Sequence, residues 1–216
     1  MFFYHIIQRS KVEVITYLCS IAHTAIFHQN LDRIILGVVS SVIHRCVNHK
    51  ITRFYLSEDD EITLSLGGKP MFDVIDFRPY VDSSYFTNWI PDLYYTSGSE
   101  EEFIQTVWGI VSQLTIYSSE ITETPRYPLE TLLAGGGDCE DTAILVASML
   151  KAAPVDWEIS LVYLDSHNPT APVEPNHVVV FVKTASNQYY IETTSDTRMN
   201  PYPDGIHGWY FELTDD

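Results

Sequence analysis

Positive charge is scarce in this chain, which has 12 Lys and Arg against 29 Asp and Glu among 216 residues. The net charge of −17 argues against a general nucleic-acid-binding role, because phosphate binding needs clustered Lys and Arg. With only 3 Cys and 10 Gly, disulfide scaffolds and collagen are excluded as well. The acidic excess instead favours solubility and basic or neutral partners.

Long apolar runs and targeting signals are missing too. The stretch from Met1 to Ile7 is apolar but too short for a signal peptide. The uncharged stretch from Val14 to Leu31 is a poor membrane span, because it contains two His, a Gln and an Asn. The odd number of cysteines fits a reducing compartment, so we expect a cytoplasmic protein.

Charge is distributed unevenly along the chain. Residues 1–54 carry six basic and two acidic residues, a net charge of +4, whereas the remainder carries a net charge of −21. Apolar spacing predicts helices over residues 11–28 and 31–47, so we expect residues 1–54 to form a helical N-terminal extension. We expect these helices to pack on the main domain. Membrane-surface association of residues 1–50 is the alternative, since the segment is apolar and basic.

The rest of the chain has two further parts. Residues 55–98 are expected to form short strands and an irregular connection. In residues 99–216 helical periods give way to strand periods, which indicates an α+β fold with helices on one side of an antiparallel sheet. The expected helices begin at Ser99, Pro128 and Asp138, and the expected strands cover residues 158–164, 177–182, 188–193 and 208–213.

A glycine run followed by acidic residues surrounds one of the three cysteines. The segment Gly135-Gly136-Gly137-Asp138-Cys139-Glu140-Asp141 places Cys139 in the first turn of a predicted helix. The unpaired N–H groups and the helix dipole favour a thiolate there, and they can also hold an oxyanion. The charges of the two following carboxylates oppose a thiolate, so a nearby His is needed to restore the balance.

Two later residues complete a possible catalytic set. His177 opens the strand His177–Val182, and Glu192 lies on the next strand, after a short turn at residues 185–187. Counting through this hairpin brings Glu192 diagonally close to His177, where a carboxylate can orient an imidazole. His167, in a polar turn, is the rival histidine. A structural role for each residue alone stays open, but the order Cys, His, carboxylate is more specific than any one of them.

These motifs resemble the transglutaminase-like superfamily, and more narrowly its microbial cysteine-peptidase-type domains. The resemblance rests on residues 126–132, the Gly-Gly-Gly-Asp-Cys-Glu-Asp motif, Asn176-His177-Val178-Val179 and residues 190–194, and it covers about residues 99–213. It implies a papain-like core in which a Cys-bearing helix packs on an antiparallel sheet. The more familiar third residue of the family is Asp, so the Glu at position 192 is a departure.

The resemblance also implies roles for individual residues. Cys139 would be the nucleophile, His177 the general base and then acid, and Glu192 the orienting carboxylate. Gln113 resembles a family Gln that donates to the oxyanion, although a solvent-facing helix Gln is the plainer interpretation. Trp108 could line the pocket or belong to the core. Attack on an amide carbonyl of a protein or peptide would give a thioester.

Several alternatives stay open at this stage. Water as acceptor gives a peptidase or deamidase, which we favour, and an amine gives a transglutaminase. A catalytically silent scaffold domain would keep the fold without the chemistry. A metal site at Asp138, Glu140 and Asp141 is disfavoured, because the spacing matches neither zinc nor EF-hand patterns. No metal or cofactor is therefore expected, and the sequence carries no signal for an oligomeric state.

Overall fold

The computed structural model describes residues 61–66, 69–119, 124–194 and 206–214. The predicted N-terminal helical extension, with Cys19 and Cys46, lies outside these described residues. Within them, no helix is both long enough and apolar enough to cross a bilayer.

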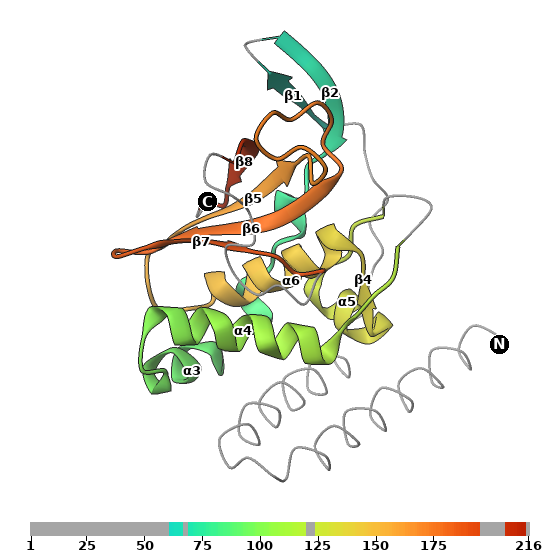
Figure 1. Ribbon diagram of the computed structural model, residues 1–216. Coiled ribbons are helices and arrows are strands. Elements are labelled where there is room, and N and C mark those ends of the chain that lie inside the picture. Colours follow the sequence, from blue (N-terminus) through green and yellow to red (C-terminus); the bar gives the residue numbers. More distant parts are fainter. Residues whose placement is uncertain (1–60, 67–68, 120–123, 195–205, 215–216) are drawn as a thin grey trace, which may run out of the picture.

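A four-stranded antiparallel sheet forms the centre of the fold, with strand order β7-β6-β5-β8 (Figure 1). The two central strands are buried along nearly their whole length, because their Val, Ile and Leu side chains cover both faces. The predicted strands are therefore present, and the α+β fold class is confirmed. Their bounds are β5 (Glu158–Leu164), β6 (His177–Lys183), β7 (Gln188–Ile191) and β8 (Gly208–Glu212).

Helix α6 (Cys139–Lys151) lies directly against one face of this sheet, in contact with β5 and β6. All its residues from Glu140 to Leu150 are buried, because α4 (Glu100–Leu114) and α5 (Pro128–Ala134) cover its other sides. Figure 1 shows the resulting layers, with the sheet above α6 and α4 below it. The helix that carries Cys139 is thus held rigidly at the centre of the core.

Helix α4 begins where the sequence predicts. The Ser99 hydroxyl accepts a hydrogen bond from the Glu102 backbone N–H at 3.1 Å. The Glu102 carboxylate accepts from the N–H of Gly98 rather than of Ser99, so the capping box is shifted by one residue. The apolar face of α4 is buried against α6, through Phe103, Ile104, Val107, Ile110 and Val111.

The region between residues 61 and 98 is more regular than the sequence suggests. Strands β1 (Glu61–Leu66) and β2 (Lys69–Ile75) form an antiparallel hairpin. Two short 3-10 helices (Arg78–Tyr80 and Ser83–Tyr85) and helix α3 (Ile90–Thr96) follow, in a stretch expected to be irregular. Leu64, Phe77, Phe86 and Ile90 are buried in the same core as α6. The tertiary packing of these apolar residues supplies order that local periodicity does not indicate.

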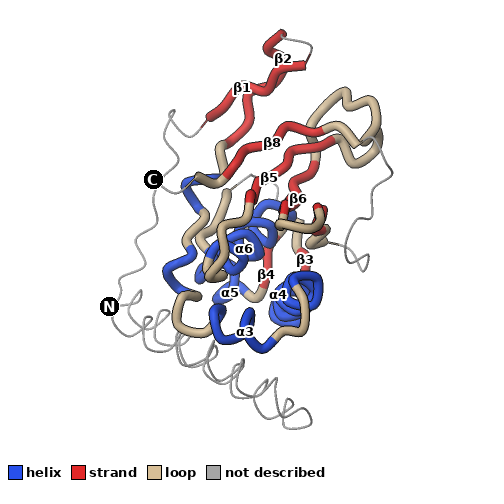
Figure 2. The backbone as a smooth tube through the Cα atoms, turned by 90° about the vertical axis from the view of Figure 1, so that its left-hand side faces the viewer, coloured by secondary structure: helices blue, strands red, loops and turns tan. Residues whose placement is uncertain are grey.

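The hairpin stands beyond the sheet, away from the helices (Figure 2). The Tyr163 hydroxyl of β5 donates to the Ile75 carbonyl and accepts from the Phe77 N–H, and the Tyr163 and Phe77 rings stack with centroids 5.3 Å apart. The Trp209 indole N–H of β8 donates to the Ser65 carbonyl at 2.7 Å. The hairpin is therefore attached to the sheet at two places.

Candidate active site

The three glycines before the cysteine each meet a different backbone requirement. Gly135 ends α5 in the left-handed region at φ 78°, where glycine is favoured. Gly136 and Gly137 form the short strand β4, which pairs in parallel with β3 (Ile116–Tyr117). A Cβ on Gly136 would lie 2.0 Å from the Ile116 carbonyl oxygen. The glycine run thus allows close packing immediately before Cys139.

A buried ion pair lies behind this turn. The Asp141 carboxylate is fully buried and accepts hydrogen bonds from the backbone N–H and the guanidinium of Arg126. A Cβ on Gly137 would lie 2.0 Å from Asp141 Oδ2, so the absence of a side chain there makes room for the carboxylate. Burial raises the pKa of Asp141 to about 6, and Arg126 opposes this shift. The sequence analysis did not predict this pair.

Cys139 occupies the first position of α6, as predicted, and is partly buried there. Its hydrogen bond goes to Glu140 Oε2 at 3.6 Å, and within the described residues none joins it to His177. Burial and the charge of Glu140 raise the pKa of Cys139 to about 12, although the Val178 N–H lowers it. The opposing effect of the following carboxylate agrees with the sequence, and burial of the thiol adds to it.

His177 and Glu192 are joined directly. His177 Nε2 lies 2.8 Å from Glu192 Oε2, and both side chains are largely buried. The pairing of Val180 with Ile191 places Glu192 diagonally across from His177, as counting through the hairpin predicts. The extra methylene of Glu relative to Asp does not prevent this contact.

Besides the contact with His177, Glu192 accepts three hydrogen bonds from Thr194 and Trp108. Its Oε1 accepts from the backbone N–H and the hydroxyl of Thr194, each at 2.8 Å. Its backbone carbonyl accepts from the Trp108 indole N–H of α4 at 2.7 Å. Next to it, the Thr193 hydroxyl lies 2.8 Å from the Thr142 hydroxyl of α6. These bonds connect the end of β7 to both α4 and α6, and sequence analysis found no signal for them beyond the residues themselves.

Cys139 and His177 line one cavity of about 300 Å³. Four separate segments contribute to it: the β1–β2 hairpin with the residues that follow it, the start of α6, strand β5, and the start of β6 with the chain leading into it. Its remaining lining residues are Glu61, Asp73, Val74, Ile75, Phe77, Glu140, Tyr163, Pro175, Asn176 and Val178. Cys139 therefore shares an open cavity with His177, whose Nε2 contacts Glu192.

Two other candidates lie away from this cavity. Gln113 is exposed on α4, where its side-chain amide donates to the Gly109 carbonyl at 3.0 Å. His167 is exposed in the loop before β6, with Nδ1 2.8 Å from the Asn176 amide nitrogen. Neither residue lines the Cys139 cavity. His177 is thus the histidine that the fold brings to Cys139, and Gln113 is not brought there.

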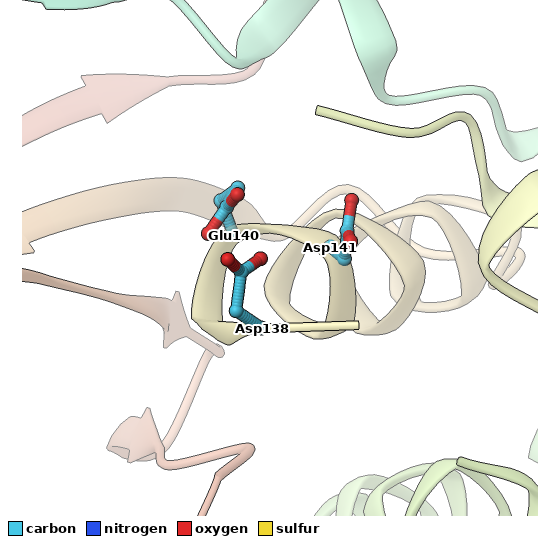
Figure 3. Close-up of side chains that lie close together, drawn as sticks. All are labelled: Asp138, Glu140 and Asp141. Carbon is cyan, nitrogen blue, oxygen red and sulfur yellow. The ribbon is translucent and has the colours of Figure 1, made fainter. Parts of the chain in front are cut away.

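The three carboxylates around Cys139 converge at the first turn of α6 (Figure 3). Asp138, Glu140 and Asp141 each have one carboxylate oxygen that lies within 4.8 Å of one oxygen of both other residues. Asp138 occupies the N-cap position without making a side-chain cap bond, and its Oδ1 is buried with no hydrogen-bond partner among the described residues. Oxygen ligands of this kind suit a hard divalent cation, which would offset the negative charge beside the thiol.

No protein-family profile matches the chain, and no curated protein matches it in sequence. Among solved structures, LapG of Legionella pneumophila is 19% identical with a TM-score of 0.42, over 57% of this chain and 70% of that one. A calcium-bound structure of that LapG is also similar, with 18% identity and a TM-score of 0.42, over 62% of this chain and 79% of that one. A candidate cysteine protease from Cytophaga hutchinsonii is 15% identical with a TM-score of 0.42, over 63% and 54% of the two chains.

The three predicted site residues lie at the ends of elements around the sheet. A cysteine opens a helix that packs on an antiparallel sheet, a histidine opens the second strand after that helix, and a carboxylate follows the next strand. This is the order of cysteine, histidine and carboxylate that the sequence motifs predict.

Proposed function

We propose that this protein is a transglutaminase-like thiol hydrolase that acts on amide bonds of proteins or peptides. Cys139 serves as nucleophile, His177 as general base and then acid, and Glu192 as the orienting carboxylate. The observation that carries the proposal is the 2.8 Å contact between His177 Nε2 and Glu192 Oε2, at the wall of the cavity that Cys139 also lines. A histidine fixed by a carboxylate beside a thiol is the arrangement that nucleophilic catalysis needs.

The contact with Glu192 also indicates which nitrogen of the neutral His177 imidazole carries the proton. An ionised carboxylate only accepts hydrogen bonds, so the proton of the neutral imidazole lies on Nε2. Nδ1 then carries the lone pair and acts as the base. Burial and Glu140 favour the protonated Cys139 thiol in this conformation, so His177 accepts the thiol proton on Nδ1 when Sγ attacks the substrate. This transfer requires the thiol to leave Glu140 and face His177.

The chemical steps follow from these positions. Sγ attacks the amide carbonyl carbon and forms a C–S bond, while the thiol proton passes to His177. Unpaired N–H groups in the first turn of α6 stabilise the oxyanion. The C–N bond then breaks, His177 returns the proton to the departing amine, and a thioester remains on Cys139. Water, deprotonated by His177, hydrolyses the thioester to a carboxylic acid and restores the thiol.

The test is incubation of the full chain with a peptide library derived from a proteome digest, followed by mass spectrometry. New termini indicate a peptidase, a gain of about 1 Da at Gln indicates a deamidase, and amine adducts indicate a transglutaminase. The expected result is cleavage or deamidation that is lost in Cys139→Ala and His177→Ala. Cys46→Ala is the matched thiol control, because the proposal gives that residue no role. A reaction unchanged in Cys139→Ala would remove Cys139 from the role of nucleophile, and no reaction at all would favour the silent scaffold.

A further inference from the structure

The cavity beside Cys139 is acidic. Of the described residues that line it, Glu61, Asp73 and Glu140 are carboxylates, His177 is a histidine, and none is Lys or Arg. This composition continues the strong negative charge of residues 55–216, and it bears on what the cavity can accept. A concave surface with charges of one sign concentrates ligands of the opposite sign.

Two of these carboxylates lie on the β1–β2 hairpin and take no part in the proposed chemical steps. Register pairs Glu61 with Ile75 and Thr63 with Asp73, so Glu61 and Asp73 lie on the same face of the hairpin. Both residues are exposed. The Thr63 hydroxyl donates to Asp73 Oδ1 at 2.7 Å, which orients that carboxylate. Glu61 forms no ion pair with any described residue. Their charges are therefore available to a ligand.

The hairpin that carries them is firmly attached to the catalytic core. Tyr163, which itself lines the cavity, bonds to both Ile75 and Phe77 at the end of β2. The carboxylates are thus presented by a fixed wall, which is what selection of a substrate group requires.

We infer that Glu61 and Asp73 form a subsite that selects a basic side chain, Lys or Arg, in the peptide substrate next to the reacting amide. This inference rests on the proposed function. It adds a substrate class to that function, because a cationic peptide is attracted to the cavity and an acidic one is repelled by all three carboxylates.

The first test needs no turnover. Cationic and anionic methanethiosulfonate reagents of similar size, the trimethylammonium-ethyl and sulfonato-ethyl compounds, are reacted with the full chain at low salt, and labelling of Cys139 is followed by peptide mapping. The ratio of the two rates cancels the thiolate fraction. We expect the ratio of cationic to anionic labelling rates at Cys139 to exceed the ratio for a single cysteine with blocked termini by about tenfold. Asp73→Asn and Glu61→Gln should each lower it roughly threefold at low ionic strength.

Glu101→Gln is the matched control, because it removes one negative charge from an exposed position on α4 and should leave the ratio unchanged. A ratio equal to that of free cysteine, or one unaffected by both hairpin variants, would overturn the inference. The second measurement compares cleavage of library peptides with Lys or Arg against those with Asp or Glu near the scissile bond. Charge-selective labelling with neither cleavage nor deamidation would refute the hydrolase alone. Cleavage without charge selectivity would refute the subsite alone.

Discussion

The indole N–H of Trp108 donates to the backbone carbonyl of Glu192 at 2.7 Å, across 84 residues of sequence. This bond fixes the backbone of the residue whose side chain holds His177. We propose that Trp108 is a positioning residue, which acts on the proposed site through Glu192 without touching the reacting atoms.

Replacing Trp108 with Phe should keep most of the packing and remove this bond. We expect a loss of about 1–2 kcal/mol in the free energy of unfolding, because the carbonyl of the buried residue Glu192 loses its donor. A fall in kcat without a matching rise in KM is expected as well, measured with any peptide substrate from the library. Trp108→Phe with unchanged kcat but lowered stability would contradict the positioning role.

Glu192→Gln tests the orienting carboxylate. The amide presents an N–H₂ group or a weaker acceptor to His177, so the imidazole loses its fixed tautomer. We expect kcat to fall by about 10²–10⁴-fold with little loss of stability. Glu192→Asp restores a carboxylate and should recover part of the rate. Equal activity in Glu192→Gln and the unmodified chain would remove this residue from the proposed triad.

Glu140→Gln tests whether the charge of Glu140 raises the pKa of the Cys139 thiol. Burial and then Glu140 raise the pKa of Cys139 to about 12, so removing the Glu140 charge should lower that pKa. The rate of iodoacetamide labelling of Cys139 at pH 8 should therefore rise, by about tenfold for each pKa unit recovered. Asp92→Asn, an exposed charge removal on α3, should have no effect. Slower labelling in Glu140→Gln would contradict the assignment.

The buried pair of Arg126 and Asp141 gives a pH dependence with a definite sign. The folded pKa of Asp141, about 6, lies above its ordinary value of 3.8, so the native state holds this proton more tightly than the unfolded chain. Its contribution to stability is present below about pH 4 and is lost as the pH rises through about 6. Arg126→Met strands the carboxylate, so we expect about 3 kcal/mol less stability at pH 8 and a much smaller loss at pH 4.5. Denaturant titrations at both pH values measure this difference, and adding Asp141→Asn should flatten it.

Four glycine-to-alanine substitutions should change the stability by different amounts, depending on the space around the new Cβ and on the backbone angle φ. Gly109→Ala, inside α4 with nothing within 4 Å of the new Cβ, should stabilise by about 0.5–1 kcal/mol. Gly135→Ala has space but a φ of 78°, so a loss of about 1 kcal/mol is expected. Gly136→Ala and Gly137→Ala meet atoms at 2.0 Å and should cost more. Thermal unfolding of all four gives the order, and a mild effect at Gly136 would contradict the close β3–β4 contact.

The sequence predicted the parts of the site that depend on local pattern. Helical spacing and the glycine run located Cys139, and the short turn after β6 allowed the distance from His177 to Glu192 to be counted. Contacts between distant segments carry no such periodic signal. The donation from Trp108, the pairing of Arg126 with Asp141 and the hairpin wall all depend on how the elements pack in three dimensions. The burial that raises the pKa of the Cys139 thiol is hidden from the sequence for the same reason, since burial is a property of the whole fold.

The attachment of the hairpin through Tyr163 has a consequence for the order of folding. His177 and Glu192 are separated by only 15 residues, whereas Tyr163 and Ile75 are separated by 88. Closing the longer loop costs more chain entropy, and contacts at large sequence separation form slowly. We therefore expect the histidine–carboxylate pair to assemble early in folding, while the acidic wall of the cavity closes last.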